Sequence, residues 1–407
     1  MLNSTFGVDN QRIPFNVPAI DEDEVAAIVH TLESKWLTTG PKTREFETQF
    51  ARYLDVPYAV AVNSCTAALH LSLVAYGIGP GDEVITTPYT FAATGEVILQ
   101  VGARPIFVDI LPDGFNIDPE KIQVAITNRT KAIIPVHFAG EPCRMDQILD
   151  LAKRHNLVVI EDAAHALGAA YHNKPIGTLS HATAFSFYAT KNLTTGEGGM
   201  VTTADHRIAE KIRSLSLHGL SHDAWKRYSK AGNWYYEICE PGFKYNMTDL
   251  AAALGQVQLA KFHRLQSKRQ KLAQLYMKAF AGTQEILLPP HPQDSRHAWH
   301  LFVIRLQSGE LPAERNRLID ALARMDIGTS VHFIPLHLHP YYRKRFGHQW
   351  GDFPQAEKTY ISALSLPLYP DLEPTQVERV ARVVRTWLSN HQNRNLKNKA
   401  DYVQKTG

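Results

Sequence analysis

The sequence predicts an α/β fold, in which a large domain with a mostly parallel sheet is followed by a small α+β domain. The chain has 407 residues, more than one hydrophobic core usually serves. From residue 58 to 204, apolar runs of strand length alternate with helical runs, the pattern of a parallel sheet covered on both faces. After residue 250 this alternation stops. We therefore expect a large domain over 1–250, a small domain over 251–390 and a disordered tail over 391–407.

The composition excludes several classes of protein. Hydrophobic residues make up 44% and charged residues 20%, as in ordinary globular proteins. The polar tail carries the formal net charge of +3, which leaves no basic face for nucleic acid. No apolar run approaches the ~20 residues of a membrane span, and the N-terminal residues lack the pattern of a secretory signal. Cys65, Cys143 and Cys239 form no CxxC pair, so we expect neither a disulfide nor a thiolate metal site, and a cytoplasmic protein.

The elements of the large domain can be placed in order. Asp21 and Glu24 have capping-box spacing before a helix over 24–37, and Pro41 is placed to open the second helix. Strands are expected at 58–64, 82–88, 104–110, 131–138, 157–164, 181–188 and 198–204. Intervening helices are expected at 66–78, 91–102 and 145–156.

The second half of the chain opens with a long helical stretch over 248–280, a natural hinge between domains. Thr375 and Glu378 have capping-box spacing for the last helix. The small domain is expected to hold strands at 297–306 and 328–334 and helices at 312–326 and 374–390.

A pair of carboxylates ends one of the predicted strands. Glu161 and Asp162 directly follow four apolar residues in "LVVIEDAA". Ligands of open α/β sheets bind beyond the carboxyl ends of the strands, so Asp162 is placed to face a ligand. A loop carboxylate that caps the following turn would explain this stretch equally well.

A second candidate feature joins a strand to a helix through Asn63, Ser64, Cys65 and Thr66. Small hydroxyl residues at this position are good helix caps. The same geometry aims free N–H groups and the helix dipole at an anion, which would make a phosphate cradle. Cys65 could be a nucleophile, but the motif places no base beside it, so a small buried thiol is favoured.

Lys191 follows the run "AFSFYAT". A lysine by itself is usually a solvated surface charge. Together with the cradle at 64–66, Asp162 and the aromatic segment "TPYTFAAT", Lys191 makes a set that suits pyridoxal phosphate. That cofactor needs an amine for its covalent bond, a carboxylate for its ring nitrogen, a phosphate anchor and a flat partner for its ring. The glycines at 196, 198 and 199 are expected to let the chain turn tightly beside the cofactor.

Several longer motifs follow one another along nearly the whole chain, from about residue 12 to 390. They include "WLTTGPKTREFE", "NSCTAALHLSL", "GPGDEVITTPYTFAAT", "EDAAHALGA", "FSFYATKNLTTGEGGM" and "PGFKYNMTDLAAALG". In these motifs the chain resembles the DegT/DnrJ/EryC1/StrS family of sugar aminotransferases. The resemblance implies fold type I of the pyridoxal phosphate enzymes, the fold of aspartate aminotransferase, with pyridoxal 5'-phosphate as the cofactor.

This resemblance also implies roles for individual residues. Lys191 would bind the cofactor covalently and move protons during the reaction. Asp162 would pair with the pyridinium nitrogen, His165 would lie near the phenolic oxygen and Phe91 would stack on the ring. Hydroxyl and backbone N–H groups would hold the phosphate, namely those of Ser64, Cys65, Thr66 and Ser186. Relatives that have histidine in place of the lysine dehydrate their sugar, so Lys191 argues for amination.

The resemblance further implies a homodimer with shared active sites. In many relatives an Asn-Tyr-Arg segment reaches across to the neighbour's phosphate, and here that segment is Lys244, Tyr245 and Asn246. Either Lys244 or Asn246 would make this contact. The Lys-Tyr-Asn form, with "HGLSHDAWKRY" upstream, is most similar to the branch that aminates UDP-4-keto-arabinose for lipid A modification.

Three histidines, His332, His337 and His339, lie close together in the small domain. His337 and His339 alternate along an extended segment and would share a face. No carboxylate or cysteine joins them in the sequence, so we expect no metal site. The resemblance instead puts His332 at the edge of the substrate pocket.

The expected reaction has two halves. L-Glutamate gives its amino group to the cofactor, and the nitrogen then passes to the C4 ketone of a nucleotide-linked sugar, here UDP-linked. Two alternatives are another type I enzyme, such as a lyase or an amino-acid transaminase, and a catalytically idle homologue that serves as a sensor or binding module. The motifs at 184–200 and 240–255 count against the first alternative. The intact Lys191, Asp162 and Ser186 count against the second.

Overall fold

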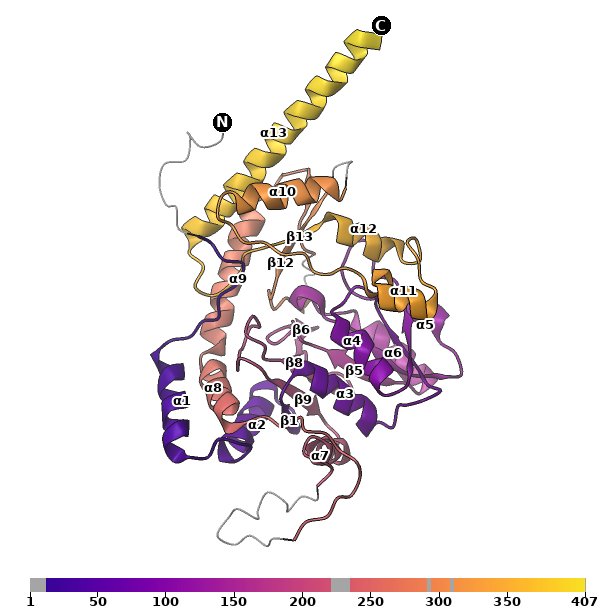
Figure 1. Cartoon of the computed structure of the whole chain (residues 1–407), viewed down its shortest axis with the longest axis vertical. Coiled ribbons are helices and arrows are strands. Elements are labelled where there is room, and N and C mark those ends of the chain that lie inside the picture. The colour runs from indigo at the N-terminus through magenta and orange to yellow at the C-terminus, as the bar shows by residue number, and fades with distance from the viewer. Residues whose placement is uncertain (1–11, 221–234, 291–293, 308–310, 407) are drawn as a thin grey trace.

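The computed structural model describes residues 12–220, 235–290, 294–307 and 311–406. The large domain is built on a seven-stranded sheet with the strand order β1-β9-β8-β5-β4-β2-β3; Figure 1 labels β1, β9, β8 and β5 of this sheet. Strand β9 is antiparallel to both of its neighbours, and the other strands run parallel to one another. All seven predicted strands of the large domain are thereby confirmed. Their bounds are β1 Tyr58–Val62, β2 Glu83–Thr86, β3 Arg104–Phe107, β4 Thr130–Ile134, β5 Val158–Asp162, β8 Ala182–Ser186 and β9 Gly199–Thr203.

Helices cover both faces of this sheet because successive side chains of a strand point to opposite faces. In β4, Ala132 and Ile134 pack with residues of α3, α4 and α7, whereas Ile133 packs with residues of α5 and α6. Helix α2 packs against the second face farther along the sheet. These helices are α2 Pro41–Leu54, α3 Cys65–Ala75, α4 Ala92–Gln100, α5 Pro119–Ala125, α6 Met145–His155 and α7 His206–Leu215.

The predicted start signals of the first helices are confirmed. Helix α1 (Glu22–Ser34) has a complete capping box between Asp21 and Glu24, and Pro41 opens α2. The long helix expected over 248–280 is two helices, α8 (Asp249–Ala260) and α9 (Phe262–Ala279). They meet at Lys261, whose ammonium group lies 2.9 Å from the Asp21 carboxylate and also contacts Glu24. This ion pair fixes the junction against the start of α1.

The small domain is built on a three-stranded antiparallel sheet. Its strands are β10 Ile286–Leu287, β12 Phe302–Leu306 and β13 Ala363–Leu366. Its helices are α10 Ala313–Ala323, α11 Pro340–Phe346, α12 Pro354–Ser362 and α13 Pro374–Thr406. The strand predicted at 297–306 is therefore confirmed as β12. A further small sheet brings β11 (Ser295–Arg296) beside β6 (Ala170–Tyr171) and β7 (Lys174–Pro175) of the large domain.

One predicted element of the small domain is wrong. The segment 328–334 is no strand; it makes one bridge, from Ser330 to Ser365, and β13 takes the place beside β12. His332 and Phe333 are neighbours that line the same cavity, which the alternating faces of a strand would not allow. Beyond the small domain, where a disordered tail is expected over 391–407, α13 continues to Thr406 and projects from the body (Figure 1, yellow). No glycine or proline interrupts residues 375–406.

The N-terminal segment crosses to the small domain. The backbone of Ile13 exchanges hydrogen bonds with Asp326 and Gly328, and its side chain is fully buried in the small-domain core with Leu318 and Leu322. The domain boundary at 250 stays a prediction. Across the described ranges, no helix combines the length and the apolar character needed to cross a membrane.

Candidate active site

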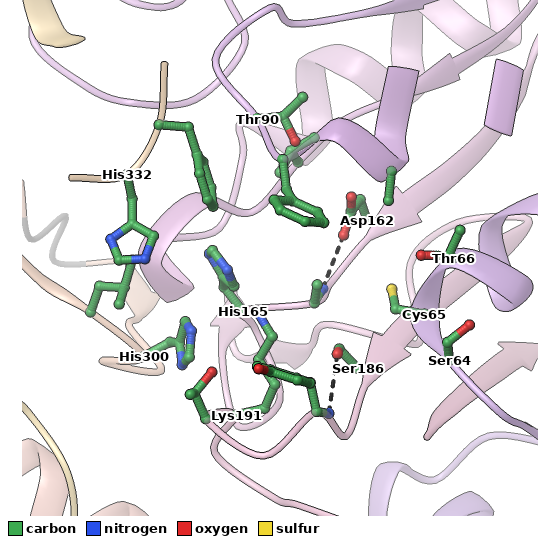
Figure 2. A pocket seen from close by; sticks show the side chains of 18 of the residues that line it. Ser64, Cys65, Thr66, Thr90, Asp162, His165, Ser186, Lys191, His300 and His332 are labelled. Carbon is green, nitrogen blue, oxygen red and sulfur yellow. Dashed lines mark hydrogen bonds between the residues drawn. The ribbon is translucent and has the colours of Figure 1, made fainter. Parts of the chain in front are cut away.

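A cavity of about 460 Å³ lies at one edge of the central sheet (Figure 2). Strands β1, β2, β5 and β8 are parallel, so the segments that follow them meet at this edge. The small domain supplies the facing wall. Nine of the predicted site residues line the cavity, namely Ser64, Cys65, Thr66, Phe91, Asp162, His165, Ser186, Lys191 and His332. Lys244 and Asn246 lie outside it.

The last two residues of β5 have different roles because they point to opposite faces. Glu161 is fully buried, and its carboxylate accepts hydrogen bonds from Ser180 (2.7 Å) and Thr183 (2.8 Å). His137 Nδ1 accepts from a backbone N–H, so its Nε2–H donates to Glu161 Oε2 over 2.8 Å. This satisfied buried network anchors the end of β5. Asp162 then lines the cavity.

Asp162 combines the two roles that its sequence position suggested. Its Oδ1 accepts the backbone N–H of Ala164 at 3.1 Å, which caps the following turn. Its Oδ2 accepts the hydroxyl of Thr94 at 2.7 Å. Burial raises the pKa of Asp162, while these two hydrogen bonds and the charge of Lys191 act in the opposite direction. The turn is therefore capped by one oxygen, and the carboxyl group stays at the cavity wall.

Thr94 is a site residue that the sequence reasoning missed. Its hydroxyl lies 2.8 Å from the hydroxyl of Thr90, so a short chain of hydroxyl groups supports Asp162. The signal was present in "TPYTFAAT", where the two threonines are four residues apart at the start of α4.

Lys191 lies in the turn after β8, where its backbone N–H donates to the carbonyl of Tyr188 at 2.9 Å. Burial lowers the pKa of Lys191 from 10.5 to about 8, although the neighbouring Cys65 and Asp162 act to raise it. A sizeable fraction of the amine is therefore neutral near pH 8. Such an amine can act as a nucleophile and as a base.

The cradle at residues 64–66 is the N-terminus of α3. The side chain of Ser64 caps the helix by accepting the N–H of Ala67 at 3.0 Å. Gly199 of β9 lies directly behind it. A Cβ at Gly199 would come within 2.5 Å of the Ser64 carbonyl group, so only glycine permits this close approach. Gly199 thus serves packing, whereas Gly196, with φ +77°, serves the expected tight turn.

Cys65 is buried, and its thiol lies 3.6 Å from the carbonyl oxygen of Ala184, to which it donates. Burial raises the pKa of Cys65 well above its usual range, so the group stays a thiol. The favoured interpretation as a small buried residue is confirmed. Only the backbone of Cys65 is available for an anion.

Two neighbouring histidines, whose rings are tilted by 37°, form the inner wall of the cavity. The ring centroids of His165 and His300 are 4.3 Å apart, and Phe333 stacks on His165 at 6.0 Å. Burial holds the pKa of both histidines well below the usual range, and the charge of Lys191 acts in the same direction. Both rings are therefore neutral. No motif in the sequence indicates His300 as a site residue.

Phe91 and His332 both line the cavity, and Figure 2 shows His332. Phe91 is 61% exposed at the start of α4, so its ring face is open to a ligand. His332 stacks on Phe15 at 5.6 Å, and its Nδ1 lies 2.9 Å from the hydroxyl oxygen of Ser365. Burial and the charge of Lys191 lower the pKa of His332 to about 4, so this ring is neutral as well.

The histidine cluster of the small domain differs from the expectation. His337 lies in the short 3-10 helix Leu336–Leu338 and not in an extended segment. It is fully buried, and its Nε2 lies 2.8 Å from Glu357, so a carboxylate does join it. His332 turns instead to the cavity. Within the described residues, no group of three or more His, Cys, Asp or Glu is arranged to hold a metal ion.

Lys244 and Asn246 lie beside the cradle on its outer side. The backbone of Tyr245 accepts the N–H of Asn63 at 2.7 Å, and Asn246 bridges to Val62. The amide of Asn246 donates to the hydroxyl of Thr39 at 2.6 Å, while the Lys244 side chain is exposed. Upstream, residues 221–228 of the "HGLSHDAWKRY" motif lie outside the described residues.

The residues of this cavity fit pyridoxal phosphate. Lys191 offers an amine of lowered pKa, Asp162 a carboxyl group, and the start of α3 free N–H groups for an anion. Phe91 offers an open aromatic face. A compound with an aldehyde, a basic ring nitrogen and a phosphate would engage all four.

Comparisons with known proteins agree with this chemistry. The model of the DegT/DnrJ/EryC1/StrS aminotransferase family matches residues 18–385. Spore coat polysaccharide biosynthesis protein SpsC of Bacillus subtilis is 51% identical over 377 residues, which are 92% of this chain and 97% of that protein.

Solved structures of aminotransferases are also similar to this chain over most of its length. A protein of Streptococcus pneumoniae assigned as a sugar aminotransferase, in its PLP form, has 36% identity and a TM-score of 0.87, over 93% of this chain and 99% of that one. PseC of Helicobacter pylori, an aminotransferase involved in the biosynthesis of pseudoaminic acid, has 30% identity and a TM-score of 0.86, over 93% and 100% of the two chains. The expected fold type I is thereby confirmed. The chain belongs to the DegT/DnrJ/EryC1/StrS aminotransferase family.

Proposed function

We propose that this protein is a pyridoxal phosphate-dependent aminotransferase that moves the amino group of L-glutamate to the C4 ketone of a nucleotide-linked sugar, with UDP as the nucleotide. The observation that carries the proposal is the meeting of Lys191, Asp162 and the start of α3 in one cavity. Family membership supports the aminotransferase reaction and the cofactor. We place the reaction in the cytoplasm, where the three free cysteines would stay reduced.

The cofactor, when bound, supplies a carbonyl that carries the amino group and a ring that withdraws electrons from the substrate. The residues of the chain position it and move protons. Lys191 Nζ would hold the cofactor and would accept and return the proton at the substrate carbon that bears nitrogen. The pKa of Lys191, about 8, suits both directions of this transfer. Asp162 holds the proton on the ring nitrogen, with Thr94 and Ala164 keeping the carboxylate in place.

Ser64, Thr66 and Ser186 line the cavity and would hold the phosphate at the start of α3, where the helix dipole favours an anion. The exposed ring of Phe91 would stack on the cofactor ring. His165 would lie near the phenolic oxygen, and His332 would contact the sugar substrate from the small-domain wall.

A sugar substrate is supported by two relatives. SpsC is a polysaccharide biosynthesis protein, and PseC acts in the biosynthesis of pseudoaminic acid. The nucleotide and the C4 position come from the family resemblance. So does a homodimer with shared active sites, in which Lys244 or Asn246 reaches the neighbour's phosphate. Lys244 suits this contact better than Asn246, because the Asn246 amide already donates to Thr39.

Direct assay tests the substrate. UDP- and dTDP-linked 4-keto sugars are offered separately to the cofactor-loaded protein with L-glutamate, and the products are followed by mass spectrometry. The expected result is an amino sugar from the UDP-linked ketone, with 2-oxoglutarate formed in equal amount. Amination of neither sugar, with amination of an amino-acid-derived keto acid instead, would overturn the proposal.

Borohydride reduction tests the site independently of the substrate. The cofactor-loaded protein should be yellow, and reduction followed by peptide mapping should place the fixed cofactor on Lys191. A reduced adduct on another lysine would contradict the assignment.

A further inference from the structure

A network of hydrogen bonds links Gln266 of α9, through Asn192, to His300 in the cavity wall, and the donor and acceptor of each bond can be assigned. The assignment starts from the carbonyl oxygen of Ala298, which can only accept a hydrogen bond. Gln266 Nε2 donates to it at 2.7 Å, and Asn192 Nδ2 donates to it at 2.8 Å. Asn192 Nδ2 also donates to Gln266 Oε1 at 3.1 Å, and this bond requires the same orientations of the two side-chain amides as the bonds to Ala298. The two amides are therefore fixed by one backbone carbonyl.

The fixed amide of Asn192 decides where His300 carries its proton. Asn192 Oδ1 can only accept, and it lies 3.1 Å from His300 Nδ1. The proton of the neutral ring must therefore be on Nδ1. This leaves a lone pair on His300 Nε2. The ring lines the cavity, and Nε2 has no hydrogen-bond partner among the described residues.

The neighbouring ring has the opposite polarity. His165 Nδ1 accepts the backbone N–H of Ala139 at 3.2 Å, so His165 carries its proton on Nε2. The centroids of the two tilted rings are 4.3 Å apart, and Figure 2 shows both beside Lys191. One ring thus offers a donor to the cavity and the other an acceptor, and neither bears a charge.

We propose that Asn192 and Gln266 are positioning residues that hold His300 with its Nε2 lone pair facing the cavity, where it accepts a hydrogen bond from an O–H or N–H group of the substrate. With the cofactor in place, His165 donates to the phenolic oxygen, and His300 remains as the acceptor for the reacting molecule. The donor is a hydroxyl group of the sugar or the ammonium group of L-glutamate. The part that concerns substrate rests on the proposed function; the proton positions do not.

The proton positions are measured directly in the cofactor-free full-length protein. Histidine labelled with nitrogen-15 reports the tautomer of each ring through two-bond proton–nitrogen correlations, and the His300→Phe variant assigns the signals of His300. The expected result is a protonated Nδ1 in His300 and a protonated Nε2 in His165. Asn192→Leu removes the accepting oxygen, so His300 should shift to a mixture of both tautomers. A wild-type His300 protonated on Nε2 would overturn the proposal, whatever the protein catalyses.

The role of the acceptor is measured in the two half-reactions, which are followed separately through the absorbance of the bound cofactor. His300→Phe keeps an aromatic ring against His165 but removes the acceptor, and Asn192→Leu keeps the ring but frees its proton. Both should lower kcat/KM about tenfold, the effect of one hydrogen bond, while the cofactor dissociation constant stays within about twofold. Loss in the glutamate half identifies the ammonium group as donor, and loss in the sugar half identifies a hydroxyl group.

Gln266→Leu tests the end of the hydrogen-bond network that is farthest from the cavity, and Gln256→Leu is its matched control. Gln256 also donates to a backbone carbonyl, that of Lys42 at 2.9 Å, but lies on α8 away from the cavity. We expect Gln266→Leu to shift the tautomer balance of His300 and Gln256→Leu to leave it unchanged. If His300→Phe alters neither half-reaction, the acceptor role is wrong, even where the tautomers are as expected.

Discussion

At the scale of single residues, the buried amine of Lys191 lowers the free energy of unfolding of the cofactor-free protein. Its pKa in the folded protein is about 8, against 10.5 for an ordinary lysine. Below pH 8 the ammonium ion must stay in a desolvated position, which favours the unfolded chain. Between pH 8 and 10.5 the unfolded chain binds more protons than the folded one, so the stability of the folded protein rises with pH.

Lys191→Met should therefore stabilise the cofactor-free protein at pH 7 by about 1–2 kcal/mol, because it removes a poorly solvated charge. The gain should shrink as the pH rises through 8 to 10.5, where the wild-type lysine is already neutral in the fold. Urea unfolding of both proteins at pH 7 and pH 10 measures this. A variant less stable than wild type at pH 7 would show that Lys191 is better solvated than its burial indicates.

Thr94 offers a second test at this scale. Its hydrogen bond lowers the pKa of Asp162, which burial raises. Thr94→Val removes the bond with almost no change of shape, so the pKa of Asp162 should rise further. Because the ionised carboxylate is the active form, the acid limb of the kcat/KM profile should move to higher pH, with a loss of about tenfold below that limb.

Thr90→Val is the matched control for this variant, because Thr90 touches Thr94 and not the carboxylate. Its pH profile should stay close to that of wild type. Equal shifts in the two variants would mean that packing at the start of α4, and not the hydrogen bond to Asp162, sets the profile.

At the scale of elements, the sequence predicted the seven strands of the large sheet and missed the short strand β13 of the small domain. The seven strands of the large sheet were predicted because each is a short apolar run of strand length. Strand β13 is only four residues long and directly follows α12, so it gave no separate signal. The apolar segment 328–334 was taken in its place, although its adjacent side chains His332 and Phe333 both line the cavity.

The contact between β9 and the start of α3 can be tested with one methyl group. A Cβ at Gly199 would lie 2.5 Å from the Ser64 carbonyl group, so Gly199→Ala must push the cradle out of place. We expect a loss of about 1–3 kcal/mol in stability and a cofactor dissociation constant at least about tenfold higher. Gly79→Ala is the control, since a Cβ there meets only the carbonyl of Val101, at 3.6 Å. Absorbance titration with pyridoxal phosphate compares the two.

At the scale of the whole molecule, the site is assembled from segments far apart in the chain. The sequence identified Asp162 and Lys191 because each ends or follows a strand of the same sheet. It could not identify His300, which reaches the cavity only because the small domain folds back against the large one. Phe15 arrives by a similar route, since Ile13 is anchored in the small-domain core. Local sequence patterns do not show which distant segments of the chain come into contact in the folded protein.

The proposed homodimer predicts the activity of dimers that combine two different variant chains. If Lys244 completes the neighbour's site, a dimer of one Lys191→Ala chain and one Lys244→Ala chain contains one site with both defects and one with neither. If Lys244 acts within its own chain, the same dimer has one defect in each site. Unfolding and refolding the two inactive variants together produces such dimers, half of the total when the amounts are equal.

Shared sites predict that the mixture recovers about one quarter of the wild-type activity, because half of the dimers each have one of two sites intact. Each variant refolded alone supplies the baseline, and an Asn246→Ala chain in place of Lys244→Ala tests the other candidate. Recovery with Lys244→Ala alone would assign the contact to the exposed lysine, in line with the hydrogen bond that already engages Asn246 with Thr39. No recovery with either chain, from refolded dimers, would mean that each subunit binds the phosphate with its own residues.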